Sequence, residues 1–90
     1  MNFYPHHIGD FNNATRHLTR IERSIYRDLI DLYYDTEEPL VLDVNQLCRL
    51  VIARDDEERA AVEQVLNEFF IETDAGWRHT RCDQEIAKYR

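Results

Sequence analysis

Cysteine, glycine and proline are scarce in this chain, and each scarcity argues against a class of protein. The 90 residues contain only two cysteines, Cys48 and Cys82, far apart and in no CxxC or Cys–His pair of metal spacing. A disulfide-rich scaffold or a zinc site is therefore not expected. We predict two reduced, partly buried thiols, with a Cys48–Cys82 disulfide as the alternative. With two glycines and two prolines, the chain also lacks a glycine-rich phosphate-binding loop.

Long hydrophobic runs are absent as well. No apolar stretch approaches the roughly 20 residues that a membrane span needs. Near the N-terminus, Pro5, His6 and His7 interrupt the apolar residues, so no secretion signal is apparent. We expect a cytoplasmic protein with a single domain over residues 1–90, in which residues 1–18 form a lead-in segment packed on the rest.

The balance of charge is strongly acidic. Asp and Glu number 18 against 11 Lys and Arg, for a net charge of −7. Such a field opposes the approach of nucleic acid, whose binders are usually basic. Ten of the basic residues are arginine, which suits bidentate carboxylate pairs and protein interfaces. The composition therefore favours protein contacts or internal ion pairs.

Hydrophobic periodicity and capping signals divide the chain into elements. Thr19-x-x-Glu22 is a capping box, and Asp43 and Asp55 are N-cap residues for two further helices. The predicted elements, in chain order, are a helix over 19–35, a short strand over 40–42, a helix over 43–53, a helix over 55–69, a hairpin with strands 70–73 and 77–80, and a helix capped by Asp83 and running to Arg90.

This order is typical of a winged-helix domain, so the predicted fold class is mostly α with a small β-hairpin (α+β), of winged-helix or helix-turn-helix type. The helices over 43–53 and 55–69 form the helix-turn-helix. Residues 40–42 pair with the hairpin, and residues 74–76 form the tip of the wing. A short helical bundle with a hairpin has the same element order and is the alternative.

The helix over 55–69 occupies the place of a recognition helix but has the wrong charge for that role. Its surface carries Glu57, Glu58, Glu63 and Glu68 against Arg59. A groove-reading helix needs Arg, Lys, Asn or Gln towards the base edges. We interpret these four glutamates as a solvated face or as a protein-interaction surface.

The wing is more basic. Trp77, Arg78, His79 and Arg81 form an aromatic and cationic strip that could stack on bases or follow a phosphate backbone. The alternative, which we favour, is that Trp77 belongs to the core and the two arginines pair with nearby acids.

No catalytic or metal pattern emerges. His6, His7, His17 and His79, even with Asp10, match no metal-ligand spacing. We expect structural polar roles for His7, Asp10 and His17, as caps or bonds to the backbone, with His7 and Asp10 as the first pair to examine. The one serine lies within a predicted helix, and neither cysteine has a histidine at a useful spacing. We predict no enzyme, no cofactor and no metal.

Several motifs together resemble the YdaU-like family, a phage and prophage domain of unknown function. They cover nearly the whole chain and read, in order, Tyr4-Pro5-x-His7-Ile8-Gly9-Asp10, Thr15-Arg16-His17-Leu18-Thr19, Tyr26-Arg27-x-Leu29-x-Asp31-Leu32-Tyr33-Tyr34, Pro39-Leu40, Phe69-Phe70 and Gly76-Trp77-Arg78-His79-x-Arg81-Cys82-Asp83-x-Glu85-Ile86. Members of this family often form the N-terminal part of longer proteins that resemble phage replication initiators or primosome components.

The resemblance implies a winged-helix-like fold, a role around phage DNA replication and a location in the cytoplasm of a bacterial host. Two departures stand out. Related sequences often carry a glycine between the second and third helices, where this chain has residues 50–54 without one. The chain also stops at Arg90, so we expect it to lack any C-terminal functional region of longer relatives.

Three functions follow as hypotheses. The first, which we favour, is a replication-associated or regulatory module acting mainly by protein contact, with a replication-related protein or a second copy as partner. The second is a sequence-specific DNA-binding regulator, which the net charge opposes. The third is an acidic DNA mimic that inhibits a basic nucleic-acid-binding protein. Aromatic residues such as Phe3, Tyr4 and Phe11 exceed what a small core hides, which keeps a homodimer open.

Overall fold

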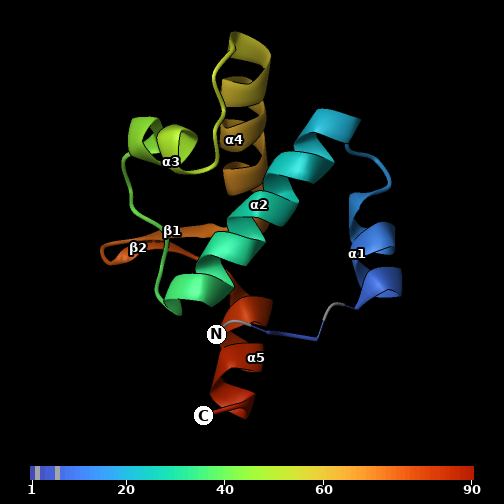
Figure 1. Ribbon diagram of the computed structural model, residues 1–90, viewed down its shortest axis with the longest axis vertical. Coiled ribbons are helices and arrows are strands. Elements are labelled where there is room, and N and C mark those ends of the chain that lie inside the picture. Colours follow the sequence, from blue (N-terminus) through green and yellow to red (C-terminus); the bar gives the residue numbers. More distant parts are fainter. Residues whose placement is uncertain (2, 6) are drawn as a thin grey trace.

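The protein combines five helices with one two-stranded sheet within the part of the chain that the structure describes. This structure is a computed structural model that describes residues 1–90 except residues 2 and 6. The elements, in order, are α1 (Ile8–Thr15), α2 (Arg20–Thr36), α3 (Val44–Leu50), α4 (Asp56–Phe69), β1 (Ile71–Thr73), β2 (Gly76–Arg78) and α5 (Thr80–Lys88). In Figure 1, α2 runs through the centre, with α1 on one side and α3 and the hairpin on the other. The prediction of a mostly helical α+β chain with a small hairpin is confirmed.

The helix α2 begins at its predicted capping box. The Glu22 backbone N–H donates to Thr19 Oγ1 over 3.1 Å, and the Thr19 N–H donates to Glu22 Oε1 over 2.8 Å. Both bonds satisfy donors that a helix start leaves without an intrahelical partner. The helix ends after Thr36, where Glu37 takes a left-handed φ of 56° and its N–H bonds to the Tyr33 carbonyl.

The helices α3 and α4 are joined by a tight turn. The chain leaves α3 at Leu50, earlier than the predicted residue 53, because Ile52 adopts a φ of 59° and Ala53 N–H bonds back to the Cys48 carbonyl over 2.8 Å. A left-handed conformation is unusual for a β-branched residue. Asp55 then caps α4, as the sequence predicts, and Glu58 completes a reciprocal capping box that was not predicted.

The hairpin is shorter than predicted, and outside it a single residue, Leu40, pairs with its second strand. β1 pairs antiparallel with β2, and Leu40 forms an isolated bridge to Trp77, with backbone N···O distances of 2.9 and 2.8 Å. The predicted strand over 40–42 is therefore reduced to this bridge. Gly76 has a φ of 135°, and a Cβ there would collide with the Leu40 carbonyl oxygen, so the close approach of the two segments requires glycine.

One helix is additional to the prediction, and the last helix, Thr80–Lys88, starts earlier and ends earlier than predicted. The lead-in contains the helix Ile8–Thr15 where the sequence predicts mostly irregular chain, since packing of Phe11 and the fully buried Thr15 outweighs weak local helix propensity. The last helix begins at Thr80 and not after Asp83, because His79 serves as its N-cap: its ring accepts the Cys82 N–H over 3.1 Å.

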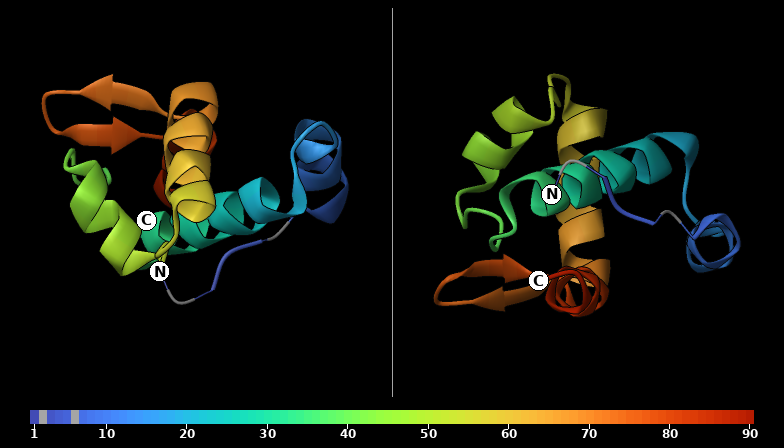
Figure 2. Two further views of the ribbon diagram at one scale, coloured as in Figure 1. Left: turned by 90° about the horizontal axis from the view of Figure 1, so that it is seen from above. Right: turned by 60° about the horizontal axis from the view of Figure 1, so that its bottom comes forward.

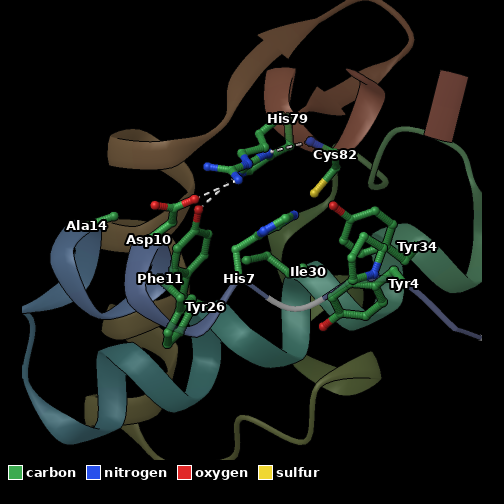
Figure 3. A pocket seen from close by; sticks show the side chains of 12 residues that line it. Tyr4, His7, Asp10, Phe11, Ala14, Tyr26, Ile30, Tyr34, His79 and Cys82 are labelled. Atoms are coloured by element: carbon green, nitrogen blue, oxygen red, sulfur yellow. Dashed lines mark hydrogen bonds and ion pairs between the residues drawn. The ribbon is translucent and has the colours of Figure 1, made fainter. Parts of the chain in front are cut away.

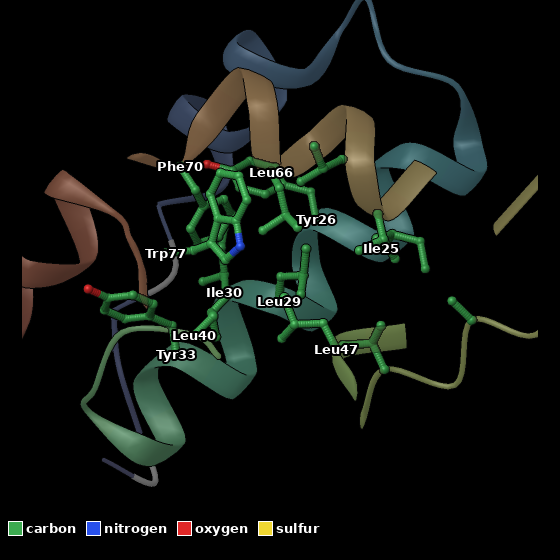
Figure 4. Packing of buried hydrophobic residues seen from close by; sticks show 14 of the residues in the cluster. Ile25, Tyr26, Leu29, Ile30, Tyr33, Leu40, Leu47, Leu66, Phe70 and Trp77 are labelled. Atoms are coloured by element: carbon green, nitrogen blue, oxygen red, sulfur yellow. The ribbon is translucent and has the colours of Figure 1, made fainter. Parts of the chain in front are cut away.

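The core lies where α2 crosses α4, with α3, α5 and the hairpin closing its sides (Figures 1 and 2). Figure 4 shows residues of α2, α3, α4 and β2 meeting there, and Cys82 and Ile86 of α5 belong to the same cluster. The largest side chains with under 2% exposure include Tyr33, Leu29, Leu47 and Leu66. Both cysteines are free and buried, in agreement with the prediction of two reduced thiols.

Candidate functional site

The helix α4 presents acidic side chains to solvent. Glu57 and Glu63 are exposed and form no ion pair with any residue that the structure describes. The other two predicted glutamates have structural partners: Glu58 completes the α4 capping box, and Glu68 lies 2.5 Å from Nε2 of His17. Of the four, Glu57 and Glu63 therefore keep their full charge for a partner.

A surface hollow of about 350 Å³ between α3 and α4 adds to this acidic character. Its charged lining residues are Asp43, Asp56, Arg59 and Glu63. The Arg59 guanidinium donates to the side-chain oxygen of Asn45, a neutral group, so it offsets one carboxylate of the three. The charged lining of this hollow is therefore acidic, with three carboxylates against one guanidinium.

The four residues of the predicted wing strip differ in exposure: the rings of Trp77 and His79 are buried, and the two arginines lie on the surface. Trp77 and His79 are 8% and 9% exposed, so neither ring is available for stacking on a base. Arg78 pairs with Asp83 over 3.2 Å, and Arg81 pairs with Asp10 over 2.9 Å. This arrangement agrees with the favoured alternative, in which Trp77 belongs to the core and the two arginines pair with nearby acids, and not with base stacking by Trp77 and His79. The two arginines remain on the surface, with their charges compensated.

His79 is the centre of a buried polar network. Its Nε2 lies 2.8 Å from the Tyr26 hydroxyl, while its Nδ1 accepts the Cys82 backbone N–H. An Nδ1 that accepts carries no proton, so the ring is neutral with its proton on Nε2, which donates to Tyr26. Burial lowers the pKa of His79, with Arg81 acting in the same direction and Asp83 against it. The network joins α2 to the start of α5.

A narrow pocket of about 100 Å³ lies beneath α1, between that helix, α2 and α5 (Figure 3). Its walls include the rings of Tyr4 and Tyr34, stacked at 4.0 Å, and the thiol of Cys82. Burial raises the pKa of Cys82 to about 12. The sulfur is therefore a protonated thiol at neutral pH, and such a thiol lacks the thiolate that nucleophilic chemistry requires.

The predicted structural polar residues connect the lead-in to the rest of the chain. His7 Nε2 lies 3.6 Å from a Glu85 carboxylate oxygen, and Asp10 pairs with Arg81, so both contact α5 and not each other. His17 instead contacts Glu68 on α4. These three residues thus make side-chain contacts between elements, where the sequence predicts caps or backbone bonds.

No group of three or more His, Cys, Asp or Glu side chains that could hold a metal occurs among the described residues. His6, one of the four histidines considered above as metal ligands, lies outside them. Within the described part of the chain, no helix is long and apolar enough to cross a membrane.

One basic cluster was not predicted from the sequence. Arg16, Arg20 and Arg23 line a surface hollow of about 420 Å³ where α1 joins α2. The signal in the sequence is four arginines over residues 16–27 with Glu22 as the one acid among them. The prediction placed the basic side of the molecule at the wing and gave no weight to this segment.

Fold and surface together define the class of protein: a small, mostly helical α+β domain with an acidic helix face and a buried tyrosine–histidine network. The chain belongs to the family described as protein of unknown function (DUF1376), whose sequence profile matches residues 2–87. It is 35% identical over 85 residues to uncharacterized protein YdaU of Escherichia coli (strain K12), and the alignment covers 93% of this chain. The chain spans 28% of that protein's length. No solved structure shows a significant match. The resemblance to the YdaU-like family is confirmed.

Proposed function

We propose that this domain is a non-catalytic, winged-helix module of phage type that acts in DNA replication or its regulation, in the bacterial cytoplasm, mainly through protein–protein contact. The observation that carries the proposal is the free acidic face of α4. That helix occupies the place of a recognition helix, and its charge suits a basic protein surface and not a phosphate backbone.

The arrangement of elements supports the winged-helix assignment. The tight turn at residues 51–54 joins α3 to α4, and the hairpin follows α4 directly. The Leu40–Trp77 bridge ties the hairpin to the segment that precedes α3, as a third strand does in a winged helix. In Figure 1 the hairpin and α3 lie on the same side of α2.

Electrostatics decide between protein and DNA as the partner. A duplex binder gains most of its affinity by neutralising phosphates with cations. Here the α3–α4 hollow is acidic, and the two arginines of the hairpin region are paired with carboxylates. Binding DNA through these elements would break Arg78–Asp83 and Arg81–Asp10 and would bring Glu57 and Glu63 towards phosphates. A basic protein meets none of these costs.

The experiment compares a panel of purified host replication proteins (helicase, helicase loader, primase and single-strand-binding protein) by surface plasmon resonance. The test variant is Glu57→Gln/Glu63→Gln. The matched control is Glu72→Gln/Asp74→Asn, which removes the same charge from the exposed hairpin. We expect saturable binding to one component, weakened about tenfold or about 1.4 kcal/mol by the test variant alone. Binding to no component would overturn the proposed role in replication.

A second arm measures fluorescence anisotropy with labelled duplex DNA, from low to physiological salt, for the wild type and for Arg78→Ala/Arg81→Ala. We expect the two proteins to be indistinguishable. Salt-sensitive duplex binding that disappears in the variant would place the hairpin on DNA and favour the regulator hypothesis over protein contact.

A further inference from the structure

The strongest unassigned feature is the arginine hollow between α1 and α2. Arg16 is the C-cap of α1, Arg20 is the first residue of α2, and Arg23 lies one turn further along α2. The lining is completed by Asn12 and Leu18. In Figures 1 and 2 the α1–α2 connection lies on the side of the molecule opposite the hairpin. Its lining shares no residue with the α3–α4 hollow or with the two arginines of the hairpin region, so the feature goes beyond the proposed function.

Arg23 is held in place by neutral groups. Its Nε donates to Thr15 Oγ1 over 3.1 Å, and Nη2 donates to Asn12 Oδ1 over 2.7 Å. Thr15 is fully buried and donates its own hydroxyl proton to the Phe11 carbonyl, so it acts only as an acceptor for Arg23. A guanidinium has five N–H donors. These two bonds orient the group, leave its other donors available and do not cancel its charge.

The two other arginines are also uncompensated. Arg16 and Arg20 are exposed and form no ion pair or hydrogen bond with any described residue through their side chains. The acid closest in sequence, Glu22, has one carboxylate oxygen engaged by the Thr19 backbone N–H. Elsewhere on the molecule, Arg78, Arg81 and Arg90 all pair with carboxylates. Arg49 and Arg54 also form no ion pair with a described residue, but this corner brings three such arginines to one hollow.

We propose that this hollow is a phosphate-binding site, which takes a backbone phosphate of single-stranded nucleic acid or the phosphates of a free nucleotide. Guanidinium groups recognise phosphate oxygens through paired N–H donors. Three such groups around one hollow offer donors from several directions. That arrangement suits the tetrahedral oxygens of a phosphate better than the two coplanar oxygens of a carboxylate.

The geometry also fits a flexible strand better than a duplex. The site is a single hollow at one corner of a protein with a net charge of −7, and the field of that charge opposes a stiff, highly charged duplex. A single strand or a nucleotide can place one or two phosphates in the hollow and leave the rest of the molecule. Leu18 in the lining gives the sugar or base an apolar contact.

The test uses a labelled oligothymidylate of about 12 nucleotides in anisotropy titrations, with inorganic pyrophosphate and ATP as competitors and backbone amide NMR shifts to locate binding. The test variant is Arg16→Gln/Arg20→Gln. The matched control is Arg49→Gln/Arg54→Gln, which removes two other exposed arginines and the same charge. Thermal melts check that all proteins fold.

We expect the test variant to weaken oligonucleotide binding about tenfold and to lower the slope of log K against log salt by roughly 1.4, at about 0.7 for each phosphate that an arginine no longer neutralises. The control should stay close to wild type. Pyrophosphate should compete and should shift the amides of Thr15 and Arg20. Binding of ATP without binding of the oligonucleotide supports the site and identifies its ligand as a free nucleotide.

Three results would overturn the proposal. Absence of binding by the oligonucleotide, pyrophosphate and ATP at about 20 mM salt is the first. An equal loss in both variants would show a general effect of charge and no site. Tighter binding of polyglutamate than of any phosphate ligand, abolished in Arg16→Gln/Arg20→Gln, would show that this corner binds an acidic protein.

Discussion

Lowering the pH should reduce the free energy of unfolding of this protein through His79, at a pH where carboxylates are still ionised. The folded structure uses the neutral ring, because Nδ1 accepts the Cys82 N–H and a proton there would face another donor. Burial, the main cause, therefore lowers the pKa of His79 from its ordinary value of 6.5. Between the lowered pKa and about pH 6.5 the unfolded chain binds more protons than the folded one.

The free energy of unfolding should therefore fall as the pH is lowered, as expected for a histidine whose pKa is lower in the folded state than in the unfolded one. The stabilisation by neutral His79 is present in full above about pH 6.5 and is lost as the pH falls through the folded pKa. In that interval the free energy of unfolding drops by up to about 1.4 kcal/mol per pH unit. Asp83 acts against the shift and Arg81 with it. The assay is urea unfolding followed by Trp77 fluorescence, at about pH 7.5, 6.5 and 5.

The control is His79→Asn, since asparagine is also a good N-cap but does not titrate. At neutral pH it should cost about 1–3 kcal/mol, because the buried Tyr26 hydroxyl loses its partner. The difference between wild type and variant should then shrink as the pH falls from about 6.5 to 5. A constant difference over that range would refute the neutral-cap argument and assign the acid sensitivity to other groups.

Three further predictions concern stability, each measured by urea unfolding. Gly76→Ala should cost at least about 2 kcal/mol, from a strained φ and a collision with a backbone carbonyl, whereas Gly9→Ala, with open space around it, should stabilise by up to about 1 kcal/mol. Ile52→Gly should stabilise by about 1 kcal/mol, because its φ of 59° suits glycine; an unchanged or lower stability would contradict this. Leu29→Ala, at a fully buried site, should cost about 3 kcal/mol, while exposed Leu50→Ala should change stability by less than about 0.5 kcal/mol.

Local signals in the sequence predict the fold well where local chemistry decides it. The starts of α2 and α4 follow from the capping boxes Thr19–Glu22 and Asp55–Glu58, in which both partners lie within four residues of each other. The start of α5 does not follow, because the cap is a histidine, a residue outside the usual set. Its ring is fixed in the cap position by Tyr26, which is 53 residues away.

For the candidate surfaces, too, the sequence predicts what neighbouring residues determine and misses what distant residues determine. The sequence alone identifies the acidic residues of α4, because they follow one another along a single helix. Whether a charge is free depends on partners far along the chain: Arg81 is neutralised by Asp10, 71 residues away, and His17 contacts Glu68 across 51 residues. Composition and spacing contain no information on such pairs, so the wing appears basic in the sequence and compensated in the structure.

A phosphate site is compatible with the net charge of −7, because the charges that act at long range are not the same as those that a bound ligand contacts. Long-range attraction depends on the whole field, and here that field repels polyanions. Contact affinity depends on groups within about a Debye length, roughly 10 Å at 0.1 M salt. At that range a ligand in the hollow meets the guanidinium groups of Arg16, Arg20 and Arg23, which line it. A short phosphate ligand should therefore bind slowly at low salt, with an association rate that rises as salt screens the acidic field, while its dissociation rate rises because the same salt screens the arginines. A long duplex, which brings many more negative charges into the repulsive field of the whole protein, should not bind.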